Sequence, residues 1–290
     1  MDFMKCQTVW KAYGGSLPKS AIIYHDALYM VKSPRTVTNR SINSNRYINQ
    51  IYAEHLCCSI IASMGYDVQE TMLGTYGSTI AVACKDFTQE TYTLKNFIQI
   101  KNSVSACKYS SKSVDLDDIL FALSHQTYID PNALETYFWD QFILDAFFGN
   151  EDRYNENWGI LQHIDTNEYQ LAPIYDCASS MDFDLEESEM IALLSDKNKC
   201  KAYILNANSV ICKQGKPINY ASFLFSCPYE SCNIALSKFL KRIDWDKIDH
   251  IIDTMPFVSN LQKQFYKTIL EMRYHLIMKH ADCYYRRRFS

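Results

Sequence analysis

The sequence predicts an α+β fold with two lobes, a small β-rich N-lobe over residues 1–90 and a larger helical C-lobe over residues 91–290. In the first range, short apolar runs alternate with glycines and polar turns, a pattern typical of strands. In the second range, apolar residues recur at helical spacing between recognisable caps. A chain of 290 residues, 48% of them hydrophobic, can bury a core of that size.

A hairpin is predicted near the start of the N-lobe. Residues 21–24 and 28–31 are apolar runs that are separated by His25-Asp26-Ala27. Such runs on either side of a short polar segment are typical of paired strands. We therefore expect Lys32 to leave the end of the second strand.

A long helix follows in the sequence. Residues 45–64 carry apolar side chains at helical spacing, and Gly65 comes next as a stop signal. Glu54 shares a face with some of these apolar residues. Two further strands, bounded by glycines, are predicted at residues 68–73 and 78–84.

Two helices are predicted at the start of the C-lobe. Asp115 or Ser113 can cap the first, which is expected to end near residue 128. Asp130-Pro131 supplies the cap and first-turn proline of the second, which runs to Phe148 and stops at Gly149.

The later part of the C-lobe divides into a hairpin, a loop and two helices. Residues 158–162 and 169–172 are apolar stretches joined by polar residues, which favours a hairpin. The polar, weakly patterned residues 182–208 are expected to form a loop. Amphipathic helices are predicted over residues 233–255 and 260–284.

Composition argues against several functional classes. The net charge is −4 and the only basic run is Arg286-Arg287-Arg288, so we expect no direct nucleic-acid surface. No leader and no apolar stretch of roughly 20 residues is found, which predicts a cytoplasmic protein with no membrane segment. The eleven cysteines are odd in number and scattered, which favours buried reduced thiols over disulfides or zinc.

Asp152, Asn157 and Asp176 carry the main functional signal. Phosphoryl transfer from ATP needs a carboxylate that orients the attacking hydroxyl and two further oxygen ligands that hold magnesium. The spacing Asp-x4-Asn, followed by a second Asp, matches that demand. The sequence therefore predicts a kinase with a two-lobed, protein-kinase-like fold, in which Asp152 is catalytic and the other two bind the metal.

The predicted hairpin would bring the two metal ligands together. A turn centred between Thr166 and Asn167 places Asn157 opposite Asp176, and neighbouring strands lie about 4.8 Å apart. One cation with ligand distances near about 2.1 Å could then be shared by both side chains. The alternative is that all three polar residues serve only as local turn and cap residues.

A glycine-rich segment could supply the phosphate-binding half of the site. Gly14-Gly15-Ser16 and Lys19 precede the first strand of the predicted hairpin, and Lys32 ends the second. Backbone N–H groups of such a turn can approach phosphates, and the lysines can neutralise them. Glu54 on the next helix could pair with Lys32. A plain surface turn with a solvated lysine is the alternative, since the segment matches no established nucleotide motif.

These residues resemble the HipA-like serine/threonine kinases of bacteria. Gly149 to Asn157 and Leu171 to Asp176 are similar to the catalytic and metal-binding loops of that family. The resemblance implies that Lys32 and Glu54 are the nucleotide lysine and its helix partner. Residues 82–87 resemble the strand that enters the hinge, which implies that the backbone of Ala83 and Lys85 lies near adenine.

The chain looks most like the compact members of that family, the HipT-like and CtkA-like kinases, which lack an N-terminal subdomain. Tyr154 stands where the family usually has histidine. Family members autophosphorylate serines before the loop glycine, but Ala12 and Gly14 occupy those places here, which leaves Ser16 and Ser20 as substitute sites.

The resemblance also implies partners. It points to a protein substrate such as an aminoacyl-tRNA synthetase and to an antitoxin of a toxin–antitoxin pair, and it leaves open secretion as an effector. Two other functions stay open from the residues alone. One is a small-molecule phosphotransferase, and the other is a non-catalytic nucleotide-binding module, a pseudokinase.

Overall fold

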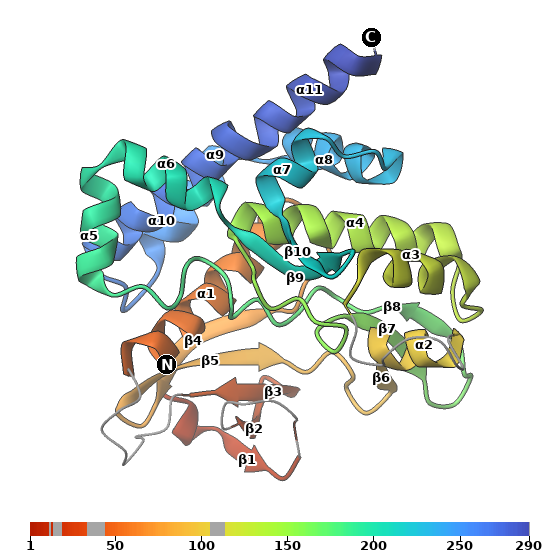
Figure 1. The fold of residues 1–290 in the computed structure, drawn as a ribbon. Coiled ribbons are helices and arrows are strands. Elements are labelled where there is room, and N and C mark those ends of the chain that lie inside the picture. The colour runs from red at the N-terminus through yellow and green to blue at the C-terminus, as the bar shows by residue number, and fades with distance from the viewer. Residues whose placement is uncertain (12, 14–18, 34–43, 105–113, 290) are drawn as a thin grey trace.

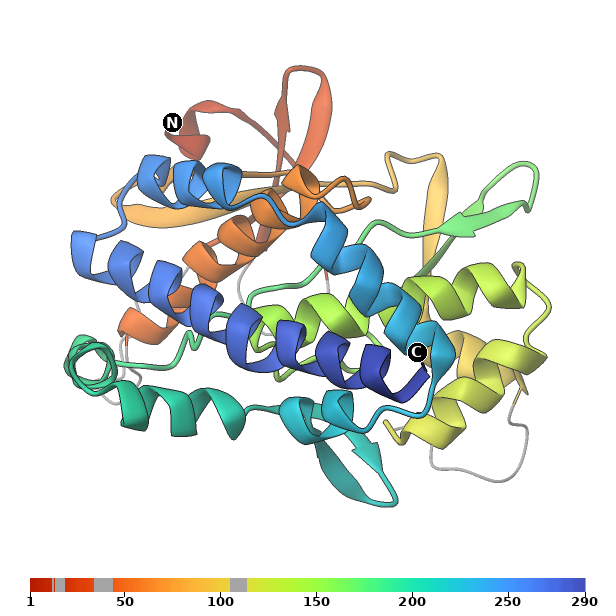
Figure 2. The same ribbon diagram turned by 90° about the horizontal axis from the view of Figure 1, so that it is seen from above.

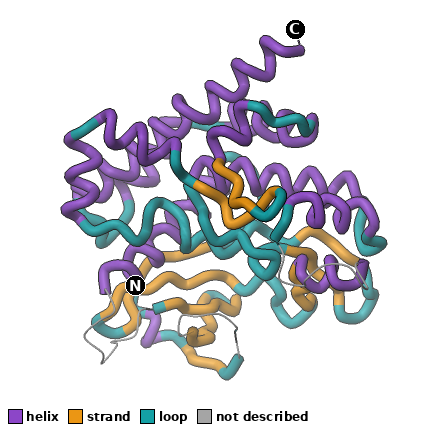
Figure 3. Tube along the Cα trace, viewed as in Figure 1, coloured by secondary structure: helices purple, strands orange, loops and turns teal. Residues whose placement is uncertain are grey.

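A computed structural model describes residues 1–11, 13, 19–33, 44–104 and 114–289 of the chain. Strands gather at one end of the molecule and helices at the other, so the predicted α+β class is confirmed (Figures 1 and 3). Helix α1 (Ser44–Ser63) lies between them and packs on β4, β5 and α9. The division of the chain at residues 90 and 91 stays a prediction.

A five-stranded antiparallel sheet forms the strand-rich end, in the order β1-β2-β3-β5-β4. Its elements, with a short 3-10 helix before them, are η1 (Phe3–Lys5), β1 (Gln7–Val9), β2 (Lys19–Tyr24), β3 (Ala27–Lys32), β4 (Thr71–Tyr76) and β5 (Thr79–Lys85). The predicted hairpin is confirmed as β2 and β3, with Lys32 at the end of β3. His25 and Asp26 form its turn with φ of 45° and 58°, which matches the twist of the strands.

The predicted helix over residues 45–64 is confirmed as α1, and Gly65 follows with a φ of 72°. The strands predicted after it are present, but β4 begins at Thr71 rather than at residue 68. The reason is a long-range contact, because Val68 forms a β-bridge with Ile174 instead of joining the sheet. This bridge connects the end of α1 to the segment that leads into Asp176.

A second sheet was not fully anticipated. Strand β6 (Tyr92–Asn96) pairs with β7 (Gly159–His163), which pairs with β8 (Tyr169–Leu171), and α2 (Phe97–Val104) follows β6. The β7–β8 hairpin is as predicted, but its register is not. Gln162 pairs with Tyr169, so the turn is centred one residue earlier than expected.

That register corrects the expected pairing of the two metal ligands. Asn157 does not stand directly across the hairpin from Asp176. In the observed register each residue of the first strand lies opposite a residue two positions earlier in the second strand than was predicted. The loop between β7 and β8 explains the shifted register. Asn167 adopts a φ of 59° near the end of this loop, whereas the sequence-based prediction placed it at the centre of the turn.

The helical part is built around α4 (Pro131–Phe148), which is almost wholly buried from Leu134 onward. Its predicted start and stop are confirmed, since Asp130 caps it and Gly149 ends it with a φ of 68°. Helix α3 (Leu116–His125) is capped by Asp115, as one of the two expectations had it, but ends three residues before the expected 128. The backbone at Gln126 is extended there and its side chain bonds to the following residues.

The expectation of a loop over residues 182–208 was wrong. This range contains α5 (Glu187–Ser195) and α6 (Lys197–Leu205). Each helix buries only two side chains, so the apolar pattern was short, while its polar residues act as caps and solvent-facing positions. Glu186 forms a capping box with Glu189, and Asp196 caps α6.

The predicted helix over residues 233–255 is two helices, α8 (Glu230–Arg242) and α9 (Trp245–Thr254), because Ile243 is extended and Asp244 caps α9. The helix predicted over 260–284 is confirmed as a rod of three segments (Figure 2). These are α10 (Asn260–Arg273), the π-helix η2 (Tyr274–Met278) and α11 (Lys279–Phe289). The remaining elements are β9 (Asn208–Lys213), β10 (Lys216–Asn219) and α7 (Tyr220–Phe225).

Two of the composition-based expectations can be compared with the structure. In the described ranges, no helix is both long and apolar enough to cross a bilayer. Every cysteine in those same ranges carries a free thiol, and most of these thiols are buried, as expected.

Candidate active site

A cavity of about 570 Å³ lies between the five-stranded sheet and the β6–β8 sheet. Its lining includes Lys19, Lys32, Asn157 and Asp176, four of the residues that the sequence singles out. Met30 and Leu94 contribute apolar walls. A cleft of this volume with a few convergent polar groups is typical of a small-ligand site.

Lys32 links three elements at one end of this cavity. Its Nζ lies 2.8 Å from Oε2 of Glu54 on α1 and 3.2 Å from Oδ1 of Asp176. Lys32 and Glu54 are fully buried, whereas the Asp176 side chain is 39% exposed. The predicted pairing of Lys32 with Glu54 is therefore present, and the same cation also holds Asp176.

The charged side chains of this group shift one another's pKa values. Burial by itself lowers the pKa of Lys32, but the carboxylates of Glu54 and Asp176 outweigh it and raise that pKa well above its usual value. Lys32 in turn lowers the pKa of Asp176. The lysine is thus cationic and Asp176 anionic at neutral pH, the charge states that suit phosphate and metal respectively.

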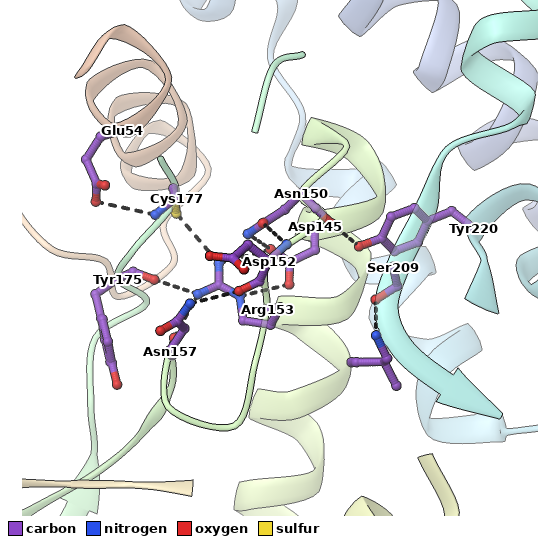
Figure 4. A network of polar contacts seen from close by, with 11 residues as sticks. Glu54, Asp145, Asn150, Asp152, Arg153, Asn157, Tyr175, Cys177, Ser209 and Tyr220 are labelled. Atoms are coloured by element: carbon purple, nitrogen blue, oxygen red, sulfur yellow. Dashed lines mark hydrogen bonds and ion pairs between the residues drawn. The ribbon is translucent and has the colours of Figure 1, made fainter. Parts of the chain in front are cut away.

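Arg153 fixes the loop that carries Asp152 and Asn157 (Figure 4). Its Nε and Nη2 bind the two oxygens of Asp145 on α4 at 2.9 and 3.0 Å. Its Nη1 donates to the carbonyls of Asn157, at 2.8 Å, and of Tyr175, at 2.6 Å. One buried guanidinium therefore joins the loop before β7 to the residue preceding Asp176, which is how Asn157 and Asp176 converge despite the shifted hairpin register.

Hydrogen bonds of Asn150 also hold this loop in place. Asn150 donates to Asp145 and accepts from the N–H of Asp152, and the hydroxyl of Tyr220 donates to the Asn150 carbonyl at 2.5 Å. Tyr154 is 42% exposed and has no part in these contacts. The Tyr154 backbone bonds to the backbones of Asp152 and Asn157 at 2.8 and 2.9 Å, so the loop is braced by Arg153, Asn150 and the backbone of residue 154 rather than by its side chain.

Asn157 has a defined orientation. Its Nδ2 donates to the carbonyl of Asp152 at 2.8 Å, so Oδ1 remains as its acceptor. An amide oxygen and the carboxylate of Asp176 are both hard ligands of the kind that magnesium prefers. Magnesium usually takes only one or two protein oxygens and completes its shell with water and phosphate, so the residues present fit this ion.

Asp152 has the electrostatic setting of a base. Burial and the neighbouring Asp176 raise its pKa above the usual value, while Arg153 opposes them. A raised pKa makes a carboxylate a better proton acceptor, and such shifts cluster at functional sites.

The backbone at Asp176 is strained. Its φ is 57°, which a residue with a side chain rarely adopts. The N–H of Cys177 donates to Oε1 of Glu54 at 3.3 Å and helps to hold this conformation. Strain of this type is retained where the surrounding structure imposes a functional geometry.

The remaining predicted residues fall into three groups. Gly14, Gly15 and Ser16 lie outside the described residues, as does Ala12. Lys19 lines the cavity, and burial and the nearby Lys32 lower its pKa. Ser20 is half-buried on β2, opposite Val31.

The two residues expected near adenine through their backbones do not line the cavity. Ala83 is fully buried inside β5. The backbone N–H of Lys85 donates to the Glu70 carbonyl and its carbonyl accepts from Gln69, so both groups are engaged within the protein.

Sequence reasoning missed the residues that follow β5. Asp86 and Thr88 line the cavity, together with Lys11 and Tyr13 from the N-terminal segment. Asp86 accepts from Lys11 Nζ at 2.6 Å and from the Tyr13 hydroxyl at 2.9 Å. The available signal was the polar residue directly after the hinge strand.

Known proteins are similar to this chain over most of its length. Residues 12–224 match the family described as the HipA-like C-terminal domain. The serine/threonine-protein kinase CtkA of Helicobacter pylori (strain J99 / ATCC 700824) is 39% identical over 278 residues, which cover 94% of this chain and 85% of that protein.

Solved structures are also similar. The crystal structure of a Helicobacter pylori proinflammatory kinase, CtkA, matches with a TM-score of 0.93 and 38% identity, covering 98% of this chain and 96% of that one. HipA from the Shewanella oneidensis MR-1 toxin–antitoxin complex with HipB and operator DNA matches with a TM-score of 0.60 and 14% identity, covering 94% and 67%. This second likeness shows a shared fold alone.

Proposed function

The chain belongs to the HipA-like C-terminal domain family, and we propose that it transfers the γ-phosphoryl group of ATP to a serine or threonine hydroxyl of a protein. It is a serine/threonine protein kinase of the HipA type, as its 39% identity to CtkA over most of the chain supports. The observation that best supports the proposal is that Lys32, Asn157 and Asp176 line one cavity. Asp152 lies close enough to Asp176 for the charge of Asp176 to raise the pKa of Asp152.

Each residue has a separate role in this proposal. Oδ1 of Asn157 and the Asp176 carboxylate would hold magnesium, which neutralises phosphate charge when bound. Nζ of Lys32, which Glu54 holds in place beside Asp176, neutralises phosphate oxygens. The Asp152 carboxylate orients the attacking hydroxyl and accepts its proton. Most of the rate enhancement then comes from positioning and electrostatics.

The proposed nucleotide pocket extends from Lys32 toward Asp86. Met30 and Leu94 provide apolar surface for a base, and Asp86 and Thr88 provide polar groups at the far end of the lining. The hinge role of the backbone of Ala83 and Lys85 stays a prediction, and we add to it the side chains of Asp86 and Thr88, which follow β5 and line the cavity. Lys19 contributes a second cation.

Transfer of labelled γ-phosphate from ATP, with and without magnesium, tests the proposal. We expect magnesium-dependent labelling of the protein itself or of lysate proteins, and loss of that labelling in Asp152→Asn and Asp176→Asn. Asp246→Asn, at an exposed position on α9, is the matched control. Labelling of both active-site variants at the wild-type level would contradict the assignment. ATP consumption with aminoglycosides or sugars, without labelled protein, would instead indicate a small-molecule phosphotransferase.

The partners are proposals that depend on family membership. A protein substrate such as an aminoacyl-tRNA synthetase, an antitoxin partner and a cytoplasmic location fit a HipA-like kinase. Autophosphorylation at Ser16 or Ser20 belongs to the same group. Phosphoproteomics after expression of wild type and of Asp152→Asn would identify the substrate, since sites phosphorylated only with wild type depend on the catalytic carboxylate.

A further inference from the structure

A second cavity, of about 610 Å³, lies away from the proposed nucleotide site. It is formed by the turn after α1, by α4, by the residues after β8 and by α8. None of the residues proposed for phosphoryl transfer lines it. Its volume lies within the range of small-molecule sites.

Three buried polar atoms of its lining residues lack hydrogen-bond partners among the residues that the structure describes, and one of them is the hydroxyl of Tyr66. The hydroxyl of Tyr137 and Oδ1 of Asp140, both on α4, have no hydrogen-bond partner within the described parts of the chain. The two residues are only 8% and 7% exposed. Buried polar groups in folded proteins are nearly always satisfied by protein, water or a ligand, so an unpaired hydroxyl and an unpaired carboxylate oxygen of one cavity's lining residues are available to bond a molecule bound there.

The electrostatics of Asp140 indicate what is missing. Its Oδ2 accepts from Nζ of Lys238, which lowers the pKa of Asp140, but burial outweighs this and raises that pKa overall. The charge of Arg242 also lowers the pKa of Asp140, so two cations together do not fully compensate for the desolvated carboxylate. A second donor, preferably cationic, would complete its hydrogen bonding.

Two cationic side chains, Lys238 and Arg242, also line this cavity. Nζ of Lys238 and the guanidinium of Arg242, both on α8, lie 5.1 and 4.6 Å from the ring centre of Tyr66. Arg242 is exposed, so its remaining donors are accessible to a ligand. The cavity lining thus includes a buried hydrogen-bond acceptor on α4 and cationic donors on α8. Ile174 adds an apolar side chain to the same lining.

We propose that this second cavity binds a small zwitterionic metabolite that carries an ammonium and a carboxylate group, either a free α-amino acid or a short peptide. The ammonium donates up to three hydrogen bonds, to Oδ1 of Asp140 and to the hydroxyl oxygen of Tyr137 among others. The carboxylate is bound by Arg242, whose guanidinium matches it in shape and charge. A simple anion would face Asp67 and Asp140, and a simple cation would leave Arg242 unused.

The occupant would act on the kinase through a shared wall. The N–H of Ile174 donates to the Asp67 carbonyl, and the N–H of Gln69 donates to the Ile174 carbonyl, both at 2.9 Å. Asp67 and Ile174 face the second cavity, whereas Gln69 and the next residues after Ile174, Tyr175 and Asp176, line the first. Binding in one cavity therefore bears directly on the segment that carries Asp176, which makes the site regulatory.

Thermal unfolding and calorimetry of the full chain test the proposal. The probes are individual L-α-amino acids and dipeptides at 10 mM, with ethylamine and acetate as single-charge controls. We expect at least one zwitterion to raise Tm by 2 °C or more and to bind at one site. Amino acids and dipeptides are separate arms, so the better class of the two is identified. The affinity for a non-hydrolysable ATP analogue should change at least twofold when the zwitterion is present.

Variants locate the binding. Tyr137→Phe and Asp140→Asn should each weaken the zwitterion at least tenfold, whereas Tyr284→Phe, at an exposed tyrosine of α11, should not. Tyr137→Phe removes a hydroxyl without a partner, so the Tm of the unliganded protein should stay unchanged and folding is not in question.

Several results would overturn the proposal. These are no binding by any zwitterion at 10 mM, equal binding to wild type and to both variants, or equally tight binding of ethylamine or acetate. An unchanged affinity for the ATP analogue would overturn the regulatory role. None of these readouts needs phosphoryl transfer, so they stand apart from the kinase assay.

Discussion

Two buried ion networks of this molecule differ in how completely they are satisfied. In the first, Lys32 is shared by Glu54 and Asp176, so two carboxylates face one cation, and the Asp176 side chain is 39% exposed. In the second, Arg153 and Asp145 form a two-bonded pair, with side chains 3% and 6% exposed, and the spare donors of Arg153 bind two backbone carbonyls.

The difference separates chemistry from support. The first network has a surplus negative charge that opens into the cavity, so it is electrostatically ready for a metal ion. The second is neutral, closed and fully bonded, so it is suited to holding loops in place. Removal of one partner from a buried ion pair is therefore strongly destabilising, whereas removal of one partner from a partly exposed pair costs little stability.

The largest expected effect is on activity, at Asp152, whose carboxylate is influenced by the charge of Asp176 in the first network. Asp152→Asn should lower the rate of phosphoryl transfer by about 10²- to 10⁴-fold, because a positioned base contributes that much. Its free energy of unfolding should change by less than about 1 kcal/mol, since surface-accessible charges contribute little. Initial rates and urea unfolding check both values. If Asp152→Asn loses activity only because it unfolds, Asp152 supports the structure rather than the chemistry, and the prediction is wrong.

The next effect is on stability, in the second network. Arg153→Met should lower the free energy of unfolding by about 3–5 kcal/mol, because it leaves Asp145 buried without its cation. Arg286→Met, which breaks an ion pair whose arginine is 67% exposed, is the control and should cost less than about 1 kcal/mol.

A double variant sharpens this contrast. Asp145→Leu with Arg153→Met should regain part of the lost stability, because an apolar pair can replace a buried ion pair. Kinase activity should stay low, since the carbonyls of Asn157 and Tyr175 still lack their donor. Recovery of both stability and activity would show that Arg153 does not position the metal ligands.

Binding of ATP and magnesium should depend on Asp176 in the first network but not on Asp152. At an ATP–magnesium concentration of 100 times Kd, wild type and Asp152→Asn should gain about 2.7 kcal/mol in unfolding free energy. Asp176→Asn should gain much less, because it lacks a proposed metal ligand. Thermal unfolding with ATP, with and without EDTA, measures the difference, and equal stabilisation of all three proteins would contradict the assigned role of Asp176.

The smallest predicted effect concerns pH and the helix that carries Glu54. Burial lowers the pKa of His55 to about 4, and its ring contacts Thr71 on β4 at 2.9 Å. Below pH 6.5 the unfolded state takes up a proton that the folded state excludes, so stability falls as pH falls toward 4. Between pH 7 and pH 5 this amounts to about 2 kcal/mol.

The His55 effect is measured as a difference between proteins. His55→Gln should show a smaller loss of stability between pH 7 and pH 5 than wild type, while His250→Gln, at an exposed position on α9, should match wild type. Identical pH dependence in wild type and His55→Gln would show that this histidine is not responsible.

Much of the fold followed from local signals. The hairpin turn at His25, the capped helix from Asp130 to Gly149 and the helix that carries Glu54 depend on neighbours within a few residues, and the sequence predicted all three. Residues 182–208 were mistaken for a loop because each helix there buries only two side chains. Short helices held mainly by caps and tertiary packing leave a weak periodic signal.

By itself the sequence determined which side chains are present for phosphoryl transfer, and it named Glu54 as a possible partner of Lys32, a contact that the packing of α1 on the sheet then decided. Only the tertiary structure decided how Asn157 and Asp176 converge, because the hairpin register was shifted and Arg153 joins their loops instead. It also decided that Asp86 lines the cavity and that Tyr137 and Asp140 face a second one. Spacing along the chain encodes local hydrogen bonds, whereas these contacts join residues that are distant in sequence and depend on how the elements pack.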